Sequence, residues 1–261
     1  MLHRYFIKIS FEGTCYNGWQ VQQNSKETVQ QKINEGLSKL LSEKIEVHGC
    51  CRTDAGVHAR ELYAQFDSER YDLAAEKERA GELGSPWLHK FNSLLPTDIS
   101  IDEIFSVAED ANARYHATAR TYQYFIHSKR NPFLVDRSYY YYSDLDITMM
   151  NKAAKVLMKN KDFSAFSKVN TQVKTNICKI VKAEWKKTDE GYIFTIRADR
   201  FLRGMVRMIV GTMIQIGKHK ISLSDLQKIL DSKDCQNAGV SVPACGLYLS
   251  KVDYPKKIFR K

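Results

Sequence analysis

The run Arg52-Thr-Asp-Ala-Gly-Val-His58 has the residue types most suited to chemistry. It follows a strand predicted over 45–51, so we expect a loop at a strand end, where rigid scaffolds often carry catalytic groups. The neighbouring Arg52 favours the ionised form of Asp54 at neutral pH. Such a carboxylate can act as nucleophile, general base or electrostatic stabiliser. For an arbitrary Arg-Thr-Asp run, however, an Asx turn with a surface ion pair is the commoner interpretation.

A second candidate is a basic stripe on the helix predicted over 201–216. Arg203 and Arg207 are four residues apart, so on that helix they would share one face while apolar pairs bury the other. Arginines in this arrangement can clamp a phosphate or hold a catalytic carboxylate. The alternative is that their stems cover the edge of a core, which is common.

A third candidate combines basic and aromatic residues on one predicted strand, over 118–127. Arg120, Tyr122 and Tyr124 alternate there and would point to the same face. Rings that stack on bases, beside cations that meet phosphates, suit RNA. Taken alone, however, the segment is better explained by half-exposed strand aromatics. The same ambiguity applies to the run SYYYYS at 138–143.

The hydrophobic periodicity predicts elements on which these candidates would sit. Alternating or β-rich runs predict strands at 4–11, 45–51, 62–67, 99–107, 118–127, 138–143, 176–187, 191–199 and 246–252. Apolar residues three or four apart predict helices at 27–43, 86–95, 147–160, 201–216 and 224–231. Residues 69–85 are rich in Glu, Lys and Ala and predict an exposed acidic helix or an insertion. The order predicts an α+β fold with antiparallel sheet and two similar subdomains, over residues 1–108 and 109–261.

Charge is distributed unevenly along the 261 residues, which carry a net charge of +10. Residues 1–110 contain 12 basic and 18 acidic residues, whereas residues 111–261 contain 28 basic and 12 acidic ones. A second half this basic favours a polyanionic partner, although a solvated basic surface has the same signature.

The cysteines and the apolar runs narrow the class of protein. The 6 cysteines include one adjacent pair, Cys50 and Cys51, and no CxxC spacing, so we expect reduced thiols and no zinc site. The longest apolar run is too short for a bilayer, and the first residues, MLHRYFIKISFEG, lack the apolar core of a signal peptide. We therefore expect a cytoplasmic protein that has no contact with a membrane.

Together the segments resemble the tRNA pseudouridine synthase A (TruA) family almost from end to end. The Arg52–His58 run is similar to the family's catalytic loop and is the most specific match. The other matching segments follow in the family's order: residues 11–22 (FEGTCYNGWQVQ), 28–30 (TVQ), 92, 94–99 (LLPTDI), 113–114, 117–124 (ATARTYQY), 201–211 (FLRGMVRMIVG) and 246–249 (GLYL).

The resemblance implies two RRM- or ferredoxin-like subdomains that share one antiparallel sheet, with flanking helices and a basic central cleft. It implies a homodimer that needs neither cofactor nor metal. The implied substrate is the anticodon stem-loop of tRNA, in which uridines at positions 38, 39 and 40 become pseudouridine. That isomerisation exchanges the C1′–N1 bond for a C1′–C5 bond and consumes no oxidant or reductant.

The resemblance also implies roles for particular residues. Asp54 would be the catalytic nucleophile, attacking either the base or the sugar. Tyr122 would lie against the target base, and Arg207 would pair with Asp54. Arg52 would help to hold the flipped nucleotide or the space that it leaves, and Leu247 would pack on the base.

Four departures from the family pattern qualify this expectation. Cys51 stands directly before Arg52, where the family usually has glycine, and it would be strained if that position needed a positive φ. Thr121 stands where a basic residue is common, Asn112 where histidine is frequent, and residues 74–88 resemble an insertion. Two alternatives stay open, namely the same chemistry on another RNA and a non-catalytic RNA-binding protein. A metal-dependent nuclease is disfavoured because the carboxylates do not cluster in the sequence.

Overall fold

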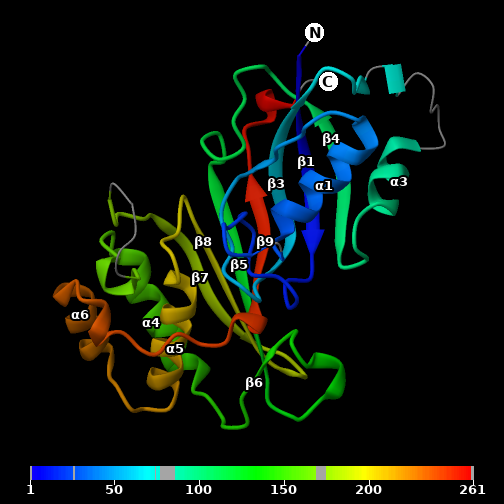
Figure 1. Cartoon of the computed structure of the whole chain (residues 1–261). Coiled ribbons are helices and arrows are strands. Elements are labelled where there is room, and N and C mark those ends of the chain that lie inside the picture. The colour runs from blue at the N-terminus through cyan, green and yellow to red at the C-terminus, as the bar shows by residue number, and fades with distance from the viewer. Residues whose placement is uncertain (1, 26, 74, 77–85, 169–174, 260–261) are drawn as a thin grey trace. The chain divides into compact units, whose positions relative to one another are not determined.

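The computed structural model describes residues 2–25, 27–73, 75–76, 86–168 and 175–259. It shows a mixed α and β protein with mostly antiparallel strands (Figure 1). The chain forms two compact units, one made of Met1–Thr118 with Leu249–Lys261 and the other of Ala119–Tyr248. In the part of the chain that is described, every helix is too short or too polar to cross a bilayer.

The first unit is built on an antiparallel sheet in which β1 lies between β3 and β4. Its strands hydrogen-bond in the order β4-β1-β3-β9, and Ile7 of β1 lies opposite Ala64 on one side and Ile104 on the other. The elements are β1 (His3–Phe11), α1 (Val29–Leu41), β2 (His48–Gly49), β3 (His58–Ser68), α3 (Pro86–Ser93), β4 (Ile99–Ser106) and the greater part of β9 (Leu247–Asp253). A short 3-10 turn, Lys256–Ile258, follows β9.

The start of α1 is fixed by the loop that precedes it. The Thr28 side chain accepts a hydrogen bond from the Gln31 amide, as an N-cap should. The Val29 and Gln30 amides, which have no partner inside the helix, donate to the carbonyls of Gly18 and Trp19 at 3.2 and 2.9 Å. The helix therefore holds the Gly18–Trp19 backbone in place.

The second unit places helices against its own strands. Its strands run in the order β5-β8-β7, with β6 pairing in parallel with β5, and α4 packs on β7, α5 and α6 (Figure 1). The elements are β5 (Ala119–His127), β6 (Tyr139–Tyr140), α4 (Ile147–Lys159), β7 (Ile180–Lys187), β8 (Gly191–Ala198), α5 (Met205–Gly217) and α6 (Leu223–Ser232). Short 3-10 turns lie at Pro132–Leu134, Ser164–Phe166, Cys235–Asn237 and Ala244–Gly246.

The prediction that Arg203 and Arg207 share a helix face is wrong. Helix α5 begins only at Met205, because Gly204 before it has a left-handed backbone (φ +73°) that ends any continuation from 201. Arg203 therefore lies in the preceding turn, and only Arg207 lies in the helix.

Four strand predictions also differ from the structure, and one of them, over 176–187, begins only at Ile180. Within the run 45–51 only β2 is a strand, and within SYYYYS only β6 is a strand. Strand pairing starts and stops where a neighbouring strand is available, and the local sequence pattern does not show where that is. The strand predicted over 62–67 is longer and begins at His58. The acidic segment predicted over 69–85, and with it the insertion at 74–88, falls largely outside the described residues.

Candidate active site

Asp54 lies on the loop between β2 and β3, at the start of a tight turn. The Val57 amide donates to the Asp54 carbonyl at 3.2 Å, and Gly56 supplies the positive φ (+74°) inside the turn. The Asp54 residue is half-buried and Arg52 is exposed. The carboxylate thus stands on a fixed backbone and can still be approached from solvent.

A second loop grips this turn on both sides of Asp54. The Trp19 amide donates to the Thr53 carbonyl at 3.2 Å, and the Gly56 amide donates to the Tyr16 carbonyl at 3.3 Å. These two hydrogen bonds flank Asp54 in the sequence. In the sequence, the segment 16–19 is one of the motifs that resemble the family. In the structure, it holds the Asp54 turn in place on both sides.

Two glycines make this close approach possible. Gly18 has φ +88°, and a Cβ there would lie 2.5 Å from the Thr53 carbonyl oxygen. A Cβ on Gly13 would lie 2.1 Å from the Val57 carbonyl oxygen. Both distances are below any real contact, so a side chain at either position would push the Asp54 turn away.

Asp98, for which the sequence predicts no role, anchors the loop that contains residues 16–19. The Tyr16 hydroxyl donates to the Asp98 carboxylate at 2.5 Å, and the Glu12 amide donates to the Asp98 carbonyl at 2.9 Å. Burial and the hydrogen bond to Asp98 both raise the pKa of Tyr16, which keeps its proton at neutral pH. The LLPTDI match contains Asp98, but its partner lies 82 residues away along the chain.

His58 fixes the far end of the same turn. Its side chain is 1% exposed, and Nδ1 accepts a hydrogen bond from the Gly13 amide at 3.0 Å. An Nδ1 that accepts carries no proton, so it has none to donate to the Glu12 carboxylate 3.4 Å away. His58 accordingly joins two loops, which is a structural role.

Cys51 adopts its backbone conformation without the strain considered above. Among the described residues other than glycine, only Ser42, Asp136, His219 and Lys233 have a positive φ. A cysteine in place of the usual glycine is therefore compatible with the loop.

Tyr122 lies on β5 in the second unit and is 8% exposed. It pairs with Ile196 of β8, and its ring packs against the Phe201 ring in a T-shaped arrangement with the centroids 5.1 Å apart. Tyr124 is fully buried, and its hydroxyl donates to the Pro243 carbonyl at 2.8 Å, so it belongs to the core. Within its own unit, the aromatic face of β5 is therefore packed rather than open.

Arg207 is held in the first turn of α5. Its Nε donates to the Val242 carbonyl at 2.7 Å. The segment 239–242 approaches the helix closely, since a Cβ on Gly211 would lie 2.0 Å from the Val240 carbonyl oxygen. The Arg207 guanidinium is thus oriented by backbone and not only by charge.

Leu247 opens β9 and is 6% exposed. Gly246 before it is needed because a Cβ there would lie 2.7 Å from the Tyr124 ring. Of the predicted site residues, the structure brings Asp54 and Arg52 together in the first unit. It places Tyr122, Arg207 and Leu247 in the second.

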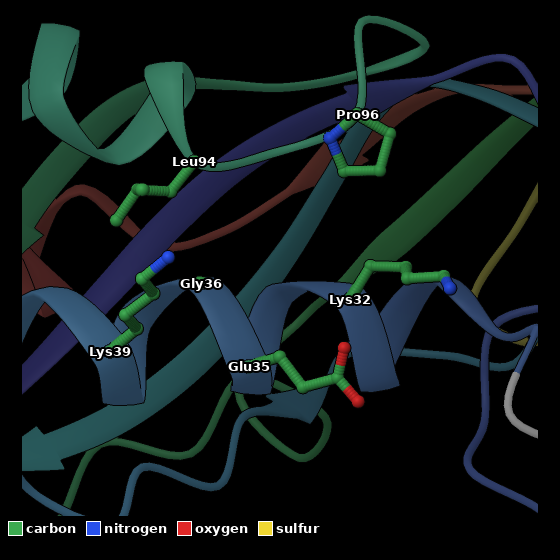
Figure 2. A pocket seen from close by; sticks show the side chains of 6 residues that line it. All are labelled: Lys32, Glu35, Gly36, Lys39, Leu94 and Pro96. Atoms are coloured by element: carbon green, nitrogen blue, oxygen red, sulfur yellow. The ribbon is translucent and has the colours of Figure 1, made fainter.

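The described residues also include a surface depression of about 200 Å³ beside α1 (Figure 2). It is lined by Lys32, Glu35, Gly36, Lys39, Leu94 and Pro96. None of the predicted site residues lines it. Where side chains are described, no three His, Cys, Asp or Glu residues are grouped as metal ligands would be.

Known proteins resemble this chain over nearly its whole length. A family model described as tRNA pseudouridine synthase matches residues 153–255. A Bacteroides fragilis protein named tRNA pseudouridine synthase A is 44% identical over 259 residues, covering 99% of each chain. A Staphylococcus aureus protein of the same name is 32% identical and covers 95% of this chain and 91% of its own. This chain belongs to the tRNA pseudouridine synthase A family.

Proposed function

We propose that this chain converts uridine to pseudouridine in the anticodon stem-loop of tRNA, at positions 38, 39 and 40, with Asp54 as the nucleophile. Membership of the family makes it an isomerase that acts on tRNA. The observation that carries the proposal is the half-buried Asp54 on a turn that hydrogen bonds hold on both sides. A carboxylate on a fixed backbone keeps its geometry while the substrate is rearranged beside it.

The chemistry requires one carboxylate and a displaced base. As the C1′–N1 bond breaks, charge develops near C1′, much as in glycoside cleavage, where a carboxylate stabilises or captures the sugar. The freed base then turns and C5 joins C1′, so the C5 proton is released to solvent and N1 takes up a proton in its place. Before this the uridine must leave its stack, at a cost of a few kcal/mol. Arg52, exposed beside Asp54, is suited to hold the flipped nucleotide or the space it leaves.

Residues of the second unit would bind the same nucleotide. In the proposal Tyr122 lies against the base, Leu247 packs on it, and Arg207 pairs with Asp54. The hydrogen bond from Arg207 Nε to Val242 supports this role, because it orients the guanidinium before substrate arrives. The predicted fold belongs to the same proposal, with two ferredoxin-like subdomains sharing one sheet around a basic cleft.

Several finer expectations complete the proposal. We expect a homodimer in the cytoplasm that needs no cofactor. Sedimentation of the purified protein tests the dimer. Activity after exhaustive dialysis against EDTA tests the absence of a metal requirement, and loss of activity that zinc or magnesium restores would refute that part.

The deciding experiment uses unmodified tRNA transcripts that carry tritium at uridine C5. Wild-type enzyme should release tritium, and mapping of the product should place pseudouridine at positions 38, 39 and 40. Asp54→Asn, which keeps the shape of the side chain, should lower the rate by about a thousandfold or more and leave tRNA affinity nearly unchanged. Asp231→Asn, an exposed substitution on α6, is the matched control.

Each other outcome identifies an alternative. Release that maps elsewhere would retain the chemistry and refute the target. Release that survives Asp54→Asn would remove Asp54 from the reaction. Tight tRNA binding without any release would favour the non-catalytic RNA-binding protein.

A further inference from the structure

Two adjacent thiols lie directly before the Asp54 turn. Cys50 and Cys51 have their sulfur atoms 3.7 Å apart. Cys50 is 1% exposed, whereas Cys51 is partly open to solvent. Cys51 is bonded to Arg52, so a change in its backbone would be passed to the next residues along the chain.

The two cysteines differ in how firmly they are held. The Cys50 amide donates to the Tyr63 carbonyl of β3 at 2.8 Å, and its side chain is packed in the core. Cys51 lies in a bend after β2, outside the ladder. If the sulfur atoms were drawn together, Cys51 would therefore move more than Cys50.

We propose that Cys50 and Cys51 form a redox modification site that reacts with a low-molecular-weight disulfide and closes into a vicinal disulfide ring. The ring displaces Arg52 and the Asp54 turn and so lowers synthase activity. The loss of activity rests on the proposed function, whereas ring formation does not.

The reaction is two successive thiol–disulfide exchanges. The Cys51 thiolate, the more accessible of the two, attacks one sulfur of the small disulfide and expels the first thiolate. The Cys50 thiol then gives its proton to solvent, and its sulfur attacks the Cys51 sulfur and expels the second thiolate. The two cysteines are oxidised by two electrons, and the small disulfide is reduced to two thiols.

The ring would be strained and hence reversible. Adjacent Cα atoms across a trans peptide are about 3.8 Å apart, below the usual range of about 4.4–6.8 Å for disulfides. Strained disulfides are more easily reduced. A small thiol should therefore reopen the ring, which distinguishes this modification from irreversible oxidation.

Digestion with trypsin gives one peptide that contains both cysteines of the proposed site. Cleavage after Lys44 and Arg52 yields the peptide 45–52 (IEVHGCCR), which contains both cysteines and no other. The reduced enzyme is incubated with oxidised glutathione, its remaining thiols are blocked with iodoacetamide, and it is digested. The expected peptide is unalkylated and lighter by about 2 Da than the dithiol form, and prior treatment with dithiothreitol should restore two alkylated cysteines.

Tritium release is measured on the same samples. Ring closure should lower the rate by about a hundredfold, as expected for a displaced catalytic group, and dithiothreitol should restore it. Cys51→Ala and, as a second variant, Cys51→Ser should keep their rates in oxidised glutathione. Cys15→Ala, which removes an exposed thiol on the neighbouring loop, should keep the wild-type response.

Three results would overturn the proposal. One is a peptide 45–52 that remains a dithiol or keeps a glutathione adduct on Cys51. The second is a closed ring with an unchanged rate, and the third is a response that Cys15→Ala abolishes. If the reduced wild-type enzyme releases no tritium, the proposed function fails, and the peptide mass still decides whether the ring forms.

Discussion

Asp54 brings a carboxylate to a place where we propose that a polyanion binds. Repulsion from phosphates would make a carboxylate there a disadvantage to a protein that only binds RNA. Its turn is nevertheless held by hydrogen bonds from Trp19 and to Tyr16, and it depends on close packing at Gly18. A binding protein has no need for that arrangement, whereas a nucleophile does.

Arg207 gives the sharpest test at the scale of one residue. Arg207→Lys keeps the charge but removes the Nε hydrogen bond to Val242 and the planar fork of donors. We expect the rate of tritium release to fall by about tenfold or more, with tRNA affinity nearly unchanged. Single-turnover assays and filter binding measure the two effects. The matched control Arg137→Lys, on an exposed turn, should retain the wild-type rate, and a similar loss there would remove the special role of Arg207.

His127 makes the stability of the protein depend on pH. Its side chain is buried, and Nδ1 has no hydrogen-bond partner among the described residues. Burial lowers the pKa of His127, with Glu190 opposing the shift in part. The unfolded chain therefore binds a proton at a higher pH than the folded one. The stabilisation is complete above the unfolded pKa and is lost as the pH falls below it.

We therefore expect His127→Gln to flatten the pH dependence of stability between pH 7.5 and pH 5.5. One proton contributes at most about 1.4 kcal/mol per pH unit to the free energy of unfolding. Urea titrations at the two pH values measure the difference for the wild type and the variant. His89→Gln, on an exposed position of α3, removes a histidine without emptying a buried site. Equal losses in the His127 variant and the wild type would show that His127 does not contribute.

Among the secondary-structure elements, the loop 12–19, the Asp54 turn and helix α1 are joined by hydrogen bonds that together fix the position of Asp54. The loop 12–19 lies between Asp98 and the Asp54 turn and is also joined to the first amides of α1. Each contact is made mostly by backbone, so the geometry depends on glycines that allow close approach rather than on particular side chains. The Gly18-Trp19 motif therefore supports the Asp54 turn through its backbone, although neither residue has catalytic chemistry.

Two glycine substitutions distinguish the effect of backbone strain from the effect of displacing the Asp54 turn. Gly18→Ala adds a positive-φ penalty and a 2.5 Å contact with the Thr53 carbonyl, whereas Gly204→Ala adds the penalty and meets only the flexible Lys168 side chain at 3.2 Å. We expect Gly204→Ala to lower the free energy of unfolding by about 1 kcal/mol and Gly18→Ala by more. Thermal unfolding measures both. Only Gly18→Ala should also lower the rate, and equal rates in the two variants would contradict the clamping role.

At the scale of the whole molecule, the charge asymmetry is the feature that bears on tRNA. The excess of basic residues in the second half attracts phosphates, and each neutralised phosphate releases counterions. Attraction of this kind is sequence-independent, so it explains affinity for tRNA rather than choice of uridine. In the proposed function, the choice of uridine comes from the shape of the stem-loop and from the residues around Asp54.

Binding of tRNA should weaken steeply as salt rises. The logarithm of the affinity should fall linearly with the logarithm of the salt concentration, and Arg203→Gln should reduce the slope by about one. Lys39→Gln, on α1 of the acidic half, should leave the slope unchanged. Filter binding over a series of potassium chloride concentrations measures the slopes. A flat line for the wild type would contradict an electrostatic interface.

The family, the α+β class and most of the elements could be predicted from the amino-acid sequence alone. Local periodicity reports which face of a helix or strand is buried, and it placed α1, α4 and β8 nearly at their observed bounds. The Arg52–His58 run was sufficient to single out Asp54, because its specificity lies in residue types at fixed spacing. These features depend on neighbours along the chain.

The way in which the Asp54 turn is held could not be predicted, because it depends on contacts between segments far apart in the sequence. Asp98 reaches Tyr16 across 82 residues, and the need for glycine at 13 and 18 follows from backbone 44 and 35 residues further along. Likewise, Tyr124 is buried beside the segment at Pro243, to whose carbonyl its hydroxyl donates. The alternation of residues along a strand does not reveal such a contact. Such contacts are set by the register of strands and the packing of loops, which are properties of residues far apart in the sequence.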